Sequence, residues 1–315
     1  MGSSKADIAV SYDVSNEFFR LWLDESMSYT CGIFDDSVKR AEMPPPGHVP
    51  EADGSAGGRA EAAGRSIGER TLEEAQREKH RILAGFAHLD SSKALLDIGC
   101  GWGANLEYQG TVTKVKSAHG ITLSEAQCAE IRRRGLPNVT AEVCSYLDFK
   151  PATRFDAIIS ICMMEHIVSP QEAREGKSIP AYRNYFRLAH EWTKPGAYFA
   201  LQTILRNFVP RDRKDVKDVG WVTYEIFPGG ITPRLEEIIA AVNPYWEVLE
   251  VKTRRLDYMK TTWHWRDRLR KNEAKIRAQW GDKVFDDYDR YLSTCVRGFE
   301  KHYQSLAQYS LKRVD

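Results

Sequence analysis

Three closely spaced glycines are the clearest sign of chemistry in this sequence. The stretch LLDIGCGWGAN, residues 95–105, places Gly99, Gly101 and Gly103 directly after an apolar run that contains Asp97. Glycine allows positive φ and lets the backbone approach a ligand closely. In α/β sheets, ligands bind beyond the carboxyl ends of the strands. The stretch therefore predicts a strand-to-helix turn around a nucleotide, in a shorter rhythm than the dinucleotide fingerprint GxGxxG.

A second polar group follows another buried strand. Glu165 and His166 come shortly after the apolar run FDAIISI, residues 155–161. Because polar residues at the carboxyl end of a buried strand usually belong to a site, we expect Glu165 to be functional. A carboxylate in this place could accept or donate a proton. His166 is expected to be structural or to support Glu165.

Alternating strands and helices are predicted to position the glycine turn and the segment with Glu165. Strands are predicted at 94–98, within 114–121, and at 139–143, 155–161, 197–205 and 246–256. Helices are predicted from 16, 71–89, from 102, 124–134 and 180–194, and the chain from 261 to the C-terminus is expected to be helical. Ser15 is the expected N-cap of the first helix, and Thr71 with Glu74 has the spacing of a capping box. The alternation implies a mainly parallel sheet that is covered on both faces, an α/β fold.

Composition excludes several classes of protein. The chain has 315 residues, 42% hydrophobic and 28% charged, with a formal net charge of +1. This balance argues against a dedicated nucleic-acid binder, which needs a basic excess. The six cysteines form no CxxC pair, and we expect free thiols and no metal site. Without a signal-peptide pattern or an apolar run of about 18 residues, a cytoplasmic protein is expected. The segment 41–66, rich in Pro, Gly, Ala and Ser, predicts a flexible insert.

The glycine turn resembles the first motif of class I S-adenosylmethionine-dependent methyltransferases. Many of those enzymes carry an acidic residue at the end of the next strand. This chain has HGITLSEAQ there, with Thr122, Ser124 and Gln127 as its polar groups. That departure narrows the resemblance to one branch of these methyltransferases.

An ordered set of motifs resembles the cyclopropane fatty acid and mycolic acid cyclopropane synthase family. The motifs are YDVSNEFFRLWLDESMSYTCGIF, LLDIGCGWGA, GITLSEAQ, SICMMEHI, TYEIFPGG, DYMKTTWHW and YLSTCVRGF, and they cover nearly the whole chain apart from 41–66. The resemblance implies one Rossmann-like methyltransferase domain over 1–315 with a seven-stranded, mainly parallel sheet. In it, 1–40 is an N-terminal helical cap, 71–256 the cofactor-binding core with substrate cap segments, and 257–315 a set of C-terminal helices.

The resemblance also implies the cofactor, S-adenosyl-L-methionine, and the residues that bind it. Tyr29 and Thr30 would close over the cofactor. The glycine turn with Asp97 would take its methionine end, and Thr122 and Gln127 its ribose. Tyr146 stands where the family usually has Trp beside the adenine, and Leu147 replaces a neighbouring acidic residue.

At the reaction centre, the resemblance implies a bicarbonate ion that takes a proton. The matching positions are Cys31, Glu165, Gln202, Ile204 and Tyr258. The family's His is Gln202 here, and an amide can donate an N–H but cannot shuttle a proton. Cys295 matches a cysteine of the family but is expected to be a buried small side chain.

Three functions stay open at this point. The first is transfer of a methyl, or net methylene, group to a carbon of an olefinic lipid or natural product, with the cation deprotonated by bicarbonate or Glu165. The second is N- or C-methylation of a small natural product without ring closure, which Gln202 favours. The third is a catalytically silent relative that binds a lipid or a partner, which the intact glycines oppose. The choice of acceptor is expected to depend on the cap segments 167–181 and 205–222. A lipid or small molecule, with transient membrane-surface contact and no nucleic acid, is the expected partner, and the oligomeric state is left open.

Overall fold

The computed structural model describes residues 2–4, 6–8, 14–34 and 70–315. The predicted insert at 41–66 lies outside the described residues. So does part of the predicted N-terminal cap, 1–40.

A seven-stranded sheet forms the centre of the molecule, with the order β3-β2-β1-β4-β5-β7-β6. Its strands are β1 Ala94–Ile98, β2 Ser117–Thr122, β3 Val139–Val143, β4 Phe155–Ile161, β5 Thr193–Arg206, β6 Trp246–Thr253 and β7 Gln304–Arg313. Strands β1 to β5 pair in parallel, and β7 runs antiparallel to both β5 and β6. The predicted α/β fold with a mainly parallel sheet is confirmed.

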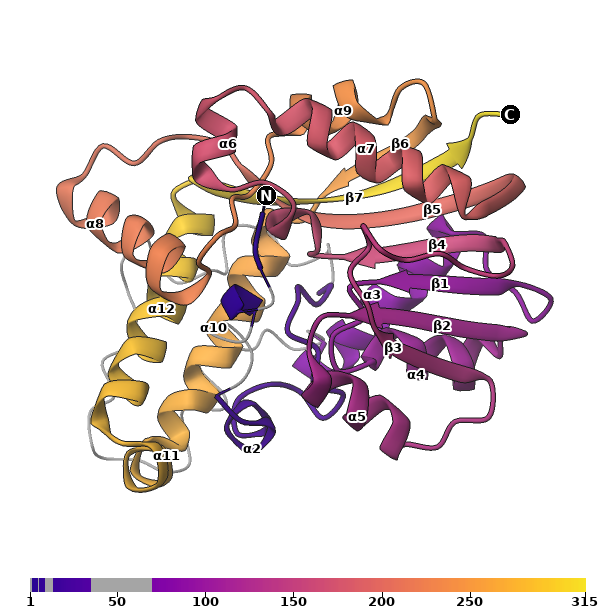
Figure 1. The fold of residues 1–315 in the computed structure, drawn as a ribbon. Coiled ribbons are helices and arrows are strands. Elements are labelled where there is room, and N and C mark those ends of the chain that lie inside the picture. Colours follow the sequence, from indigo (N-terminus) through magenta and orange to yellow (C-terminus); the bar gives the residue numbers. More distant parts are fainter. Residues whose placement is uncertain (1, 5, 9–13, 35–69) are drawn as a thin grey trace.

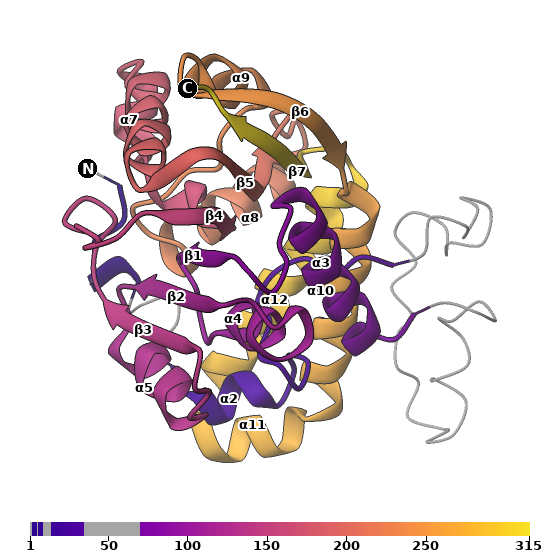
Figure 2. The same cartoon turned by 90° about the vertical axis from the view of Figure 1, so that its right-hand side faces the viewer.

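Helices cover both faces of this sheet and the carboxyl ends of its strands. They are α2 Asn16–Arg20, α3 Leu72–Phe86, α4 Ala104–Tyr108, α5 Glu125–Arg133, α6 Pro170–Arg174, α7 Ser178–Glu191, α8 Arg213–Trp221, α9 Leu235–Val242, α10 Arg255–Lys271, α11 Glu273–Trp280 and α12 Asp282–Glu300. Short helical turns lie at Gln109–Thr113, Met164–His166 and Val222–Ile226. Figure 2 shows α3 on one side of the sheet and α7 on the other. In Figure 1, α2 and α10 to α12 gather beyond the left-hand ends of the strands.

The predicted helix starts are confirmed by their caps. The Ser15 side chain accepts a hydrogen bond from the Phe18 N–H at 3.1 Å. At α3, Thr71 accepts from the Glu74 N–H while the Glu74 carboxylate accepts from the Thr71 N–H, a complete capping box. These side chains satisfy backbone donors that have no partner inside the helix.

The expectation that the chain is helical from 261 to its end is wrong for the last segment. Helix α12 ends at Glu300, and the chain then enters the sheet as β7. Ala307, Tyr309 and Leu311 are fully buried and recur at every second position, the period of a strand. The aromatic-rich helical pattern just before this strand obscured its short alternation. The C-terminal segment 257–315 is therefore three helices followed by a strand that completes the sheet.

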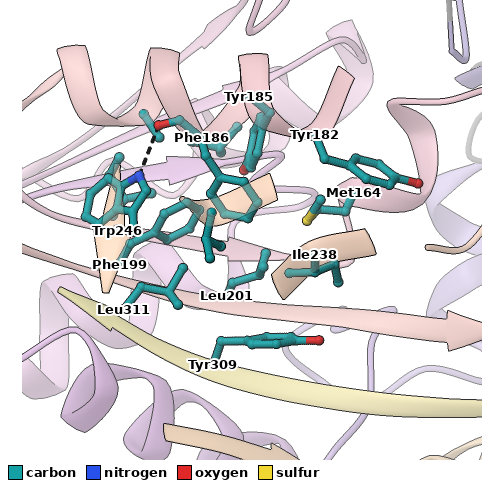
Figure 3. Close-up of a cluster of buried hydrophobic side chains, with 14 of the residues drawn as sticks. Met164, Tyr182, Tyr185, Phe186, Phe199, Leu201, Ile238, Trp246, Tyr309 and Leu311 are labelled. Atoms are coloured by element: carbon teal, nitrogen blue, oxygen red, sulfur yellow. Dashed lines mark hydrogen bonds between the residues drawn. The ribbon is translucent and has the colours of Figure 1, made fainter. Parts of the chain in front are cut away.

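Two apolar clusters share the sheet, one on each face. On one face, Leu95 packs with residues of α3, α4 and α5. On the other, its neighbour Leu96 packs with α7 and α9, as the alternation of a strand requires. Figure 3 shows this second cluster, in which the Trp246 indole donates to the Phe186 carbonyl at 2.9 Å. Met164, directly before Glu165, is buried in it.

A third cluster joins the N-terminal segment to the C-terminal helices. It contains Phe18, Phe19 and Trp22 of the first segment together with Tyr258 and Trp265 of α10. The Trp22 and Trp265 rings meet edge to face at 5.9 Å. Because segments from both ends of the chain build this cluster, it fixes residues near 30 and near 258 over the same end of the sheet. Among the described residues, no helix is both long and apolar enough to span a membrane.

Candidate functional site

The glycine turn after β1 has the conformation that its sequence predicts. Gly99, Gly101 and Gly103 have φ values of 77°, 53° and 83°, in the left-handed region. A Cβ at Gly99 would lie 2.9 Å from Met163, and one at Gly103 2.5 Å from Ile131. At Gly101, a Cβ would meet nothing within 4 Å. The turn is thus closely packed at two glycines and borders open space at the middle one, where a ligand can reach the backbone.

Asp97 lies beneath this turn as a buried carboxylate. Its Oδ2 accepts from the Asn105 side-chain amide at 3.0 Å, while its buried Oδ1 has no hydrogen-bond partner among the described residues. Burial raises the pKa of Asp97 to about 7, against the lowering effects of Asn105 and of the Lys79 charge. Its free oxygen could accept a hydrogen bond from a bound cofactor.

The residues predicted for the ribose side lie at the end of the next strand, β2. The Thr122 hydroxyl donates to Gln127 Oε1 at 2.7 Å, and the Ser124 hydroxyl caps α5 by accepting from the Gln127 N–H. The carboxamide of Gln127 is therefore held by its oxygen, and its NH2 group can donate to a ligand. Tyr146 lies further along this edge, edge to face with Tyr185 at 5.4 Å, and burial raises its pKa to about 12.

Thr30 is held in place by helix α3. Lys79 Nζ donates to the Thr30 hydroxyl at 2.8 Å and to Gln76 Oε1 at 2.8 Å. The Gln76 amide in turn donates to the Thr30 carbonyl at 2.7 Å. Tyr29, the other residue predicted to close over the cofactor, packs its ring against Trp22 at 5.2 Å and Trp265 at 5.3 Å.

Lys79 is a candidate that the sequence reasoning missed. It is 1% exposed, and desolvation lowers its pKa to about 8, opposed chiefly by Asp24. A buried lysine is rare unless it is paired. The sequence did contain a sign of this buried lysine. Lys79 falls on the buried face of α3 with Leu72, Ala75 and Gln76, where an apolar residue would be expected.

Glu165 lies in a short helical turn directly beyond β4. Its Oε1 accepts from the Ile204 backbone N–H at 2.6 Å, and its buried Oε2 has no partner among the described residues. Burial raises the pKa of Glu165 to about 7. The backbone of Gly230 packs closely on the Glu165 carbonyl, since a Cβ there would lie 2.6 Å from that oxygen. Glu165 is thus a proton acceptor or donor near neutral pH, in a fixed position.

Tyr258 and Cys31 both belong to the third cluster, on the side of the helical cap. Burial raises the pKa of Tyr258 well above its usual value. Smaller contributions come from the charges of Cys162, Cys31, Cys295 and Glu165. Burial likewise raises the pKa of Cys31, whose thiol donates to the Gly32 carbonyl at 3.1 Å. Both side chains are therefore neutral at physiological pH and can act as hydrogen-bond donors.

Gln202 takes part in a buried amide pair. Its Oε1 accepts from Gln308 Nε2 at 2.8 Å, and its Nε2 lies 4.0 Å from the sulfur of Cys162. Cys162 has a φ of 54°, and its N–H donates to the Gln202 carbonyl at 2.7 Å. Gln308 is on β7, the strand whose helical prediction was wrong, so its contact with Gln202 could not be foreseen.

Two other predicted side chains have structural surroundings. His166 Nδ1 lies 3.1 Å from the Ser3 hydroxyl, and burial lowers the pKa of His166 to about 4. Cys295 packs against the third cluster on α12, and burial raises its pKa to about 12. Neither group is charged at neutral pH.

The predicted residues therefore gather at the carboxyl ends of β1, β2, β4 and β5 and under the helical cap. Lys79 acts on the Asp97 carboxylate through its charge and donates to Thr30, and the charges of Cys31 and Glu165 both act on Tyr258. Gly99 packs against Met163, which links the two turns. The contact of each of these side chains with a cofactor or acceptor stays a prediction.

Comparison with known proteins shows one family. The model of the mycolic acid cyclopropane synthetase family matches residues 2–309. Cyclopropane mycolic acid synthase 2 of Mycobacterium tuberculosis is 28% identical over 95% of this chain and 92% of its own length. A probable fatty acid methyltransferase of Pseudomonas putida is 28% identical over 96% of this chain and 67% of its own length.

Solved structures show the same fold. The cyclopropane synthase MmaA2 from M. tuberculosis superposes with a TM-score of 0.79 at 24% identity, and 99% of each chain is covered. A coclaurine N-methyltransferase superposes with a TM-score of 0.72 at 18% identity, covering 96% of this chain and 80% of that one. The chain belongs to the mycolic acid cyclopropane synthetase family and is an S-adenosylmethionine-dependent methyltransferase.

Proposed function

We propose that this enzyme transfers a methyl group to an alkene carbon of a lipid or lipid-like natural product, with Glu165 as the base. The observation that carries the proposal is the buried Glu165 carboxylate, which has one oxygen fixed by Ile204 and the other without a partner among the described residues. Two relatives, a probable fatty acid methyltransferase and a cyclopropane mycolic acid synthase, support a lipid acceptor by their names.

The residues of the turn fit S-adenosylmethionine. Open space at Gly101 offers it backbone contacts. Asp97 Oδ1 can accept and the Gln127 NH2 group can donate a hydrogen bond, and neither has a hydrogen-bond partner among the described residues. Side chains proposed to hold it are those of Tyr29, Thr30, Asp97, Thr122, Gln127 and Tyr146, together with the backbone of Gly99, Gly101 and Gly103. When bound, the cofactor supplies an electrophilic methyl group on a sulfonium.

Methylation of an alkene leaves positive charge on the acceptor, and a proton must then be lost. A base with a pKa near the working pH serves this step best, and Glu165 has one. The rings of Tyr258 and Tyr29 offer aromatic faces that stabilise a cation. Burial excludes water, which would otherwise capture the charged acceptor. Glu165 takes the proton at Oε2, and loss of that proton gives either a cyclopropane or a methylated alkene.

Bicarbonate, the second base that the resemblance implies, fits these residues less well. The Ile204 N–H already donates to Glu165. The Gln202 oxygen is engaged by Gln308, and its amide cannot shuttle a proton. We therefore assign the proton to Glu165, with Cys31, Tyr258 and Gln202 as neutral neighbours that shape the pocket around it.

Gln202 also favours a second candidate, N-methylation of a small natural product. An amine acceptor loses its proton readily and needs no strong base, so the loss of the family's His would be tolerated. The likeness to a coclaurine N-methyltransferase shows the fold alone. Both candidates place the activity in one domain made of the core and its caps.

The experiment that separates these candidates is an open search for the product. The enzyme is incubated with methyl-labelled cofactor and a lipid and metabolite extract, and the labelled product is analysed by NMR. Upfield cyclopropane protons or a vinylic C-methyl signal support the proposal, whereas an N-methyl singlet overturns it. Calorimetry with S-adenosylhomocysteine is the companion measurement, because absence of binding would indicate a catalytically silent relative.

A further inference from the structure

A pocket of about 300 Å³ lies between the two cap segments on which the choice of acceptor is expected to depend. Its walls come from α6, the end of β5, the end of α8 with the following turn, and the loop before α9. The lining residues are Pro170, Ala173, Arg174, Arg206, Gly220, Thr223, Tyr224 and Ile231. In Figure 1, α6 and α8 lie on the left, at the same end of the sheet as α10 and α12.

The charged residues that line the pocket are all positive. Two arginines line it, and none of its lining residues is acidic. Arg206 Nη2 pairs with Glu237 at 2.9 Å, behind the lining. The buried Arg206 Nε has no hydrogen-bond partner among the described residues. Arg174 is exposed, and within the described part of the chain its guanidinium has neither an ion pair nor a hydrogen bond.

The Arg206 Nε–H lacks an acceptor among the described residues, and the exposed Arg174 guanidinium is available to a ligand. A buried N–H without an acceptor is unfavourable, and most such groups in proteins are paired. Guanidinium groups match carboxylate and phosphate oxygens by forked, charge-assisted hydrogen bonds. The volume admits such a group with a few carbons but not a whole lipid.

The pocket lies close to Glu165, because chain neighbours of two lining residues, Arg206 and Ile231, contact Glu165. Ile204, two residues before Arg206 on β5, donates its N–H to Glu165. Gly230, next to Ile231, packs on the Glu165 carbonyl. The Arg206 N–H donates to the Pro233 carbonyl at 2.9 Å, which ties the loop to the strand.

We propose that the Arg174–Arg206 pocket binds the anionic end, a carboxylate or phosphate, of the acceptor. This inference rests on the proposed function and extends it by assigning the acceptor a charge class. Ala173, Pro170 and Ile231 would contact the first carbons beyond the anion, and the remainder of the acceptor would continue toward Glu165.

The test compares four probes by calorimetry on the full chain loaded with S-adenosylhomocysteine: decanoate, decyl phosphate, 1-decanol and inorganic phosphate. We expect decanoate or decyl phosphate to bind at least tenfold more tightly than 1-decanol. Arg174→Gln should reduce that preference about tenfold and leave 1-decanol binding unchanged. Arg206→Lys, which keeps the charge beside Glu237 but removes the Nε–H, should reduce it several-fold. Arg77→Gln, an exposed position on α3, is the matched control and should change nothing.

Equal binding of decanoate, decyl phosphate and 1-decanol would overturn the inference. So would a preference for anions that Arg174→Gln leaves intact. Inorganic phosphate bound as tightly as decyl phosphate would show a site for a free anion and would also overturn it. Binding of S-adenosylhomocysteine is measured in the same experiment and reports on the proposed function, so failure of the one can be told from failure of the other.

Discussion

Two buried carboxylates, Asp97 and Glu165, have similar surroundings. Asp97 lies in the half of the site proposed for the cofactor, and Glu165 in the half proposed for the acceptor. Each lies near the carboxyl end of one of two neighbouring parallel strands, β1 and β4. Each has one oxygen hydrogen-bonded and one buried oxygen without a partner among the described residues. Burial raises the pKa of each to about 7.

Their surroundings differ in charge. The charge of Lys79 lowers the pKa of Asp97, whereas hydrogen bonds from the Ile204 backbone and from the Thr203 and Cys162 side chains lower that of Glu165. Asp97 is also part of a hydrogen-bonded chain in which Asn105 Oδ1 contacts His80 at 3.2 Å and Gln109 at 3.1 Å. The raised pKa is common to both carboxyl groups, so the difference between the two halves lies in their neighbours. In the proposed function, Asp97 contacts the cofactor and Glu165 takes the proton.

Replacement of Glu165 by Gln should have the largest effect. The variant keeps the shape of the side chain but cannot accept a proton, so methyl transfer should fall about 10²–10⁴-fold. Binding of S-adenosylhomocysteine should stay within about threefold of wild type, since this residue lies on the acceptor side. Turnover with labelled cofactor and calorimetry measure the two quantities. A variant with near-normal turnover would remove Glu165 from the chemistry.

Lys79→Met should weaken cofactor binding next most strongly. Lys79 fixes the Thr30 hydroxyl by donating to it, and a charged hydrogen bond contributes about 1.5–3 kcal/mol, or roughly 10–100-fold in affinity. 5′-Methylthioadenosine lacks the amino-acid part of the cofactor, and its affinity should be unchanged. If both ligands lose affinity equally, Lys79 acts on the fold rather than on the methionine end.

Asp97→Asn should have a smaller effect on the same half. The Asn105 contact can be kept by the new amide oxygen, while the negative charge beside the cofactor is lost, for a decrease of about tenfold in cofactor affinity. At saturating cofactor, turnover should stay within a few-fold of wild type. A loss of turnover as large as that of Glu165→Gln would erase the distinction between the two carboxylates.

The two carboxylates should also make the stability of the fold depend on pH. Because their folded-state pKa values are raised, the folded protein holds protons that the unfolded chain releases as pH increases from about 4 to 7. Each therefore lowers the free energy of unfolding over this range, by at most about 1.4 kcal/mol per pH unit. Glu165→Gln should flatten the decline between pH 4.5 and 7, as urea unfolding would measure. An unchanged slope would contradict the raised pKa.

The sequence predicted the positions that depend on local pattern. The glycine turn, the caps at Ser15 and Thr71, and the buried β4 before Glu165 are all set by neighbours within a few residues, and the structure has them as predicted. Two features depend on contacts between distant residues. Lys79 meets Thr30 across 49 positions, and Gln308 meets Gln202 across 106. Side-chain pairing over such distances leaves no periodic signal in a single sequence. The C-terminal strand was missed because the helical pattern just before it obscured its short alternation.

The most direct test of the central claim is the pH–rate profile of methyl transfer to an alkene acceptor in bicarbonate-depleted buffer. With Glu165 as the base, kcat/KM should rise about tenfold per pH unit at low pH and level off near pH 7, at the same rate as in buffer with bicarbonate. A flat profile from pH 5.5 to 8.5, or a rate that disappears without bicarbonate, would contradict the assignment of the proton to Glu165.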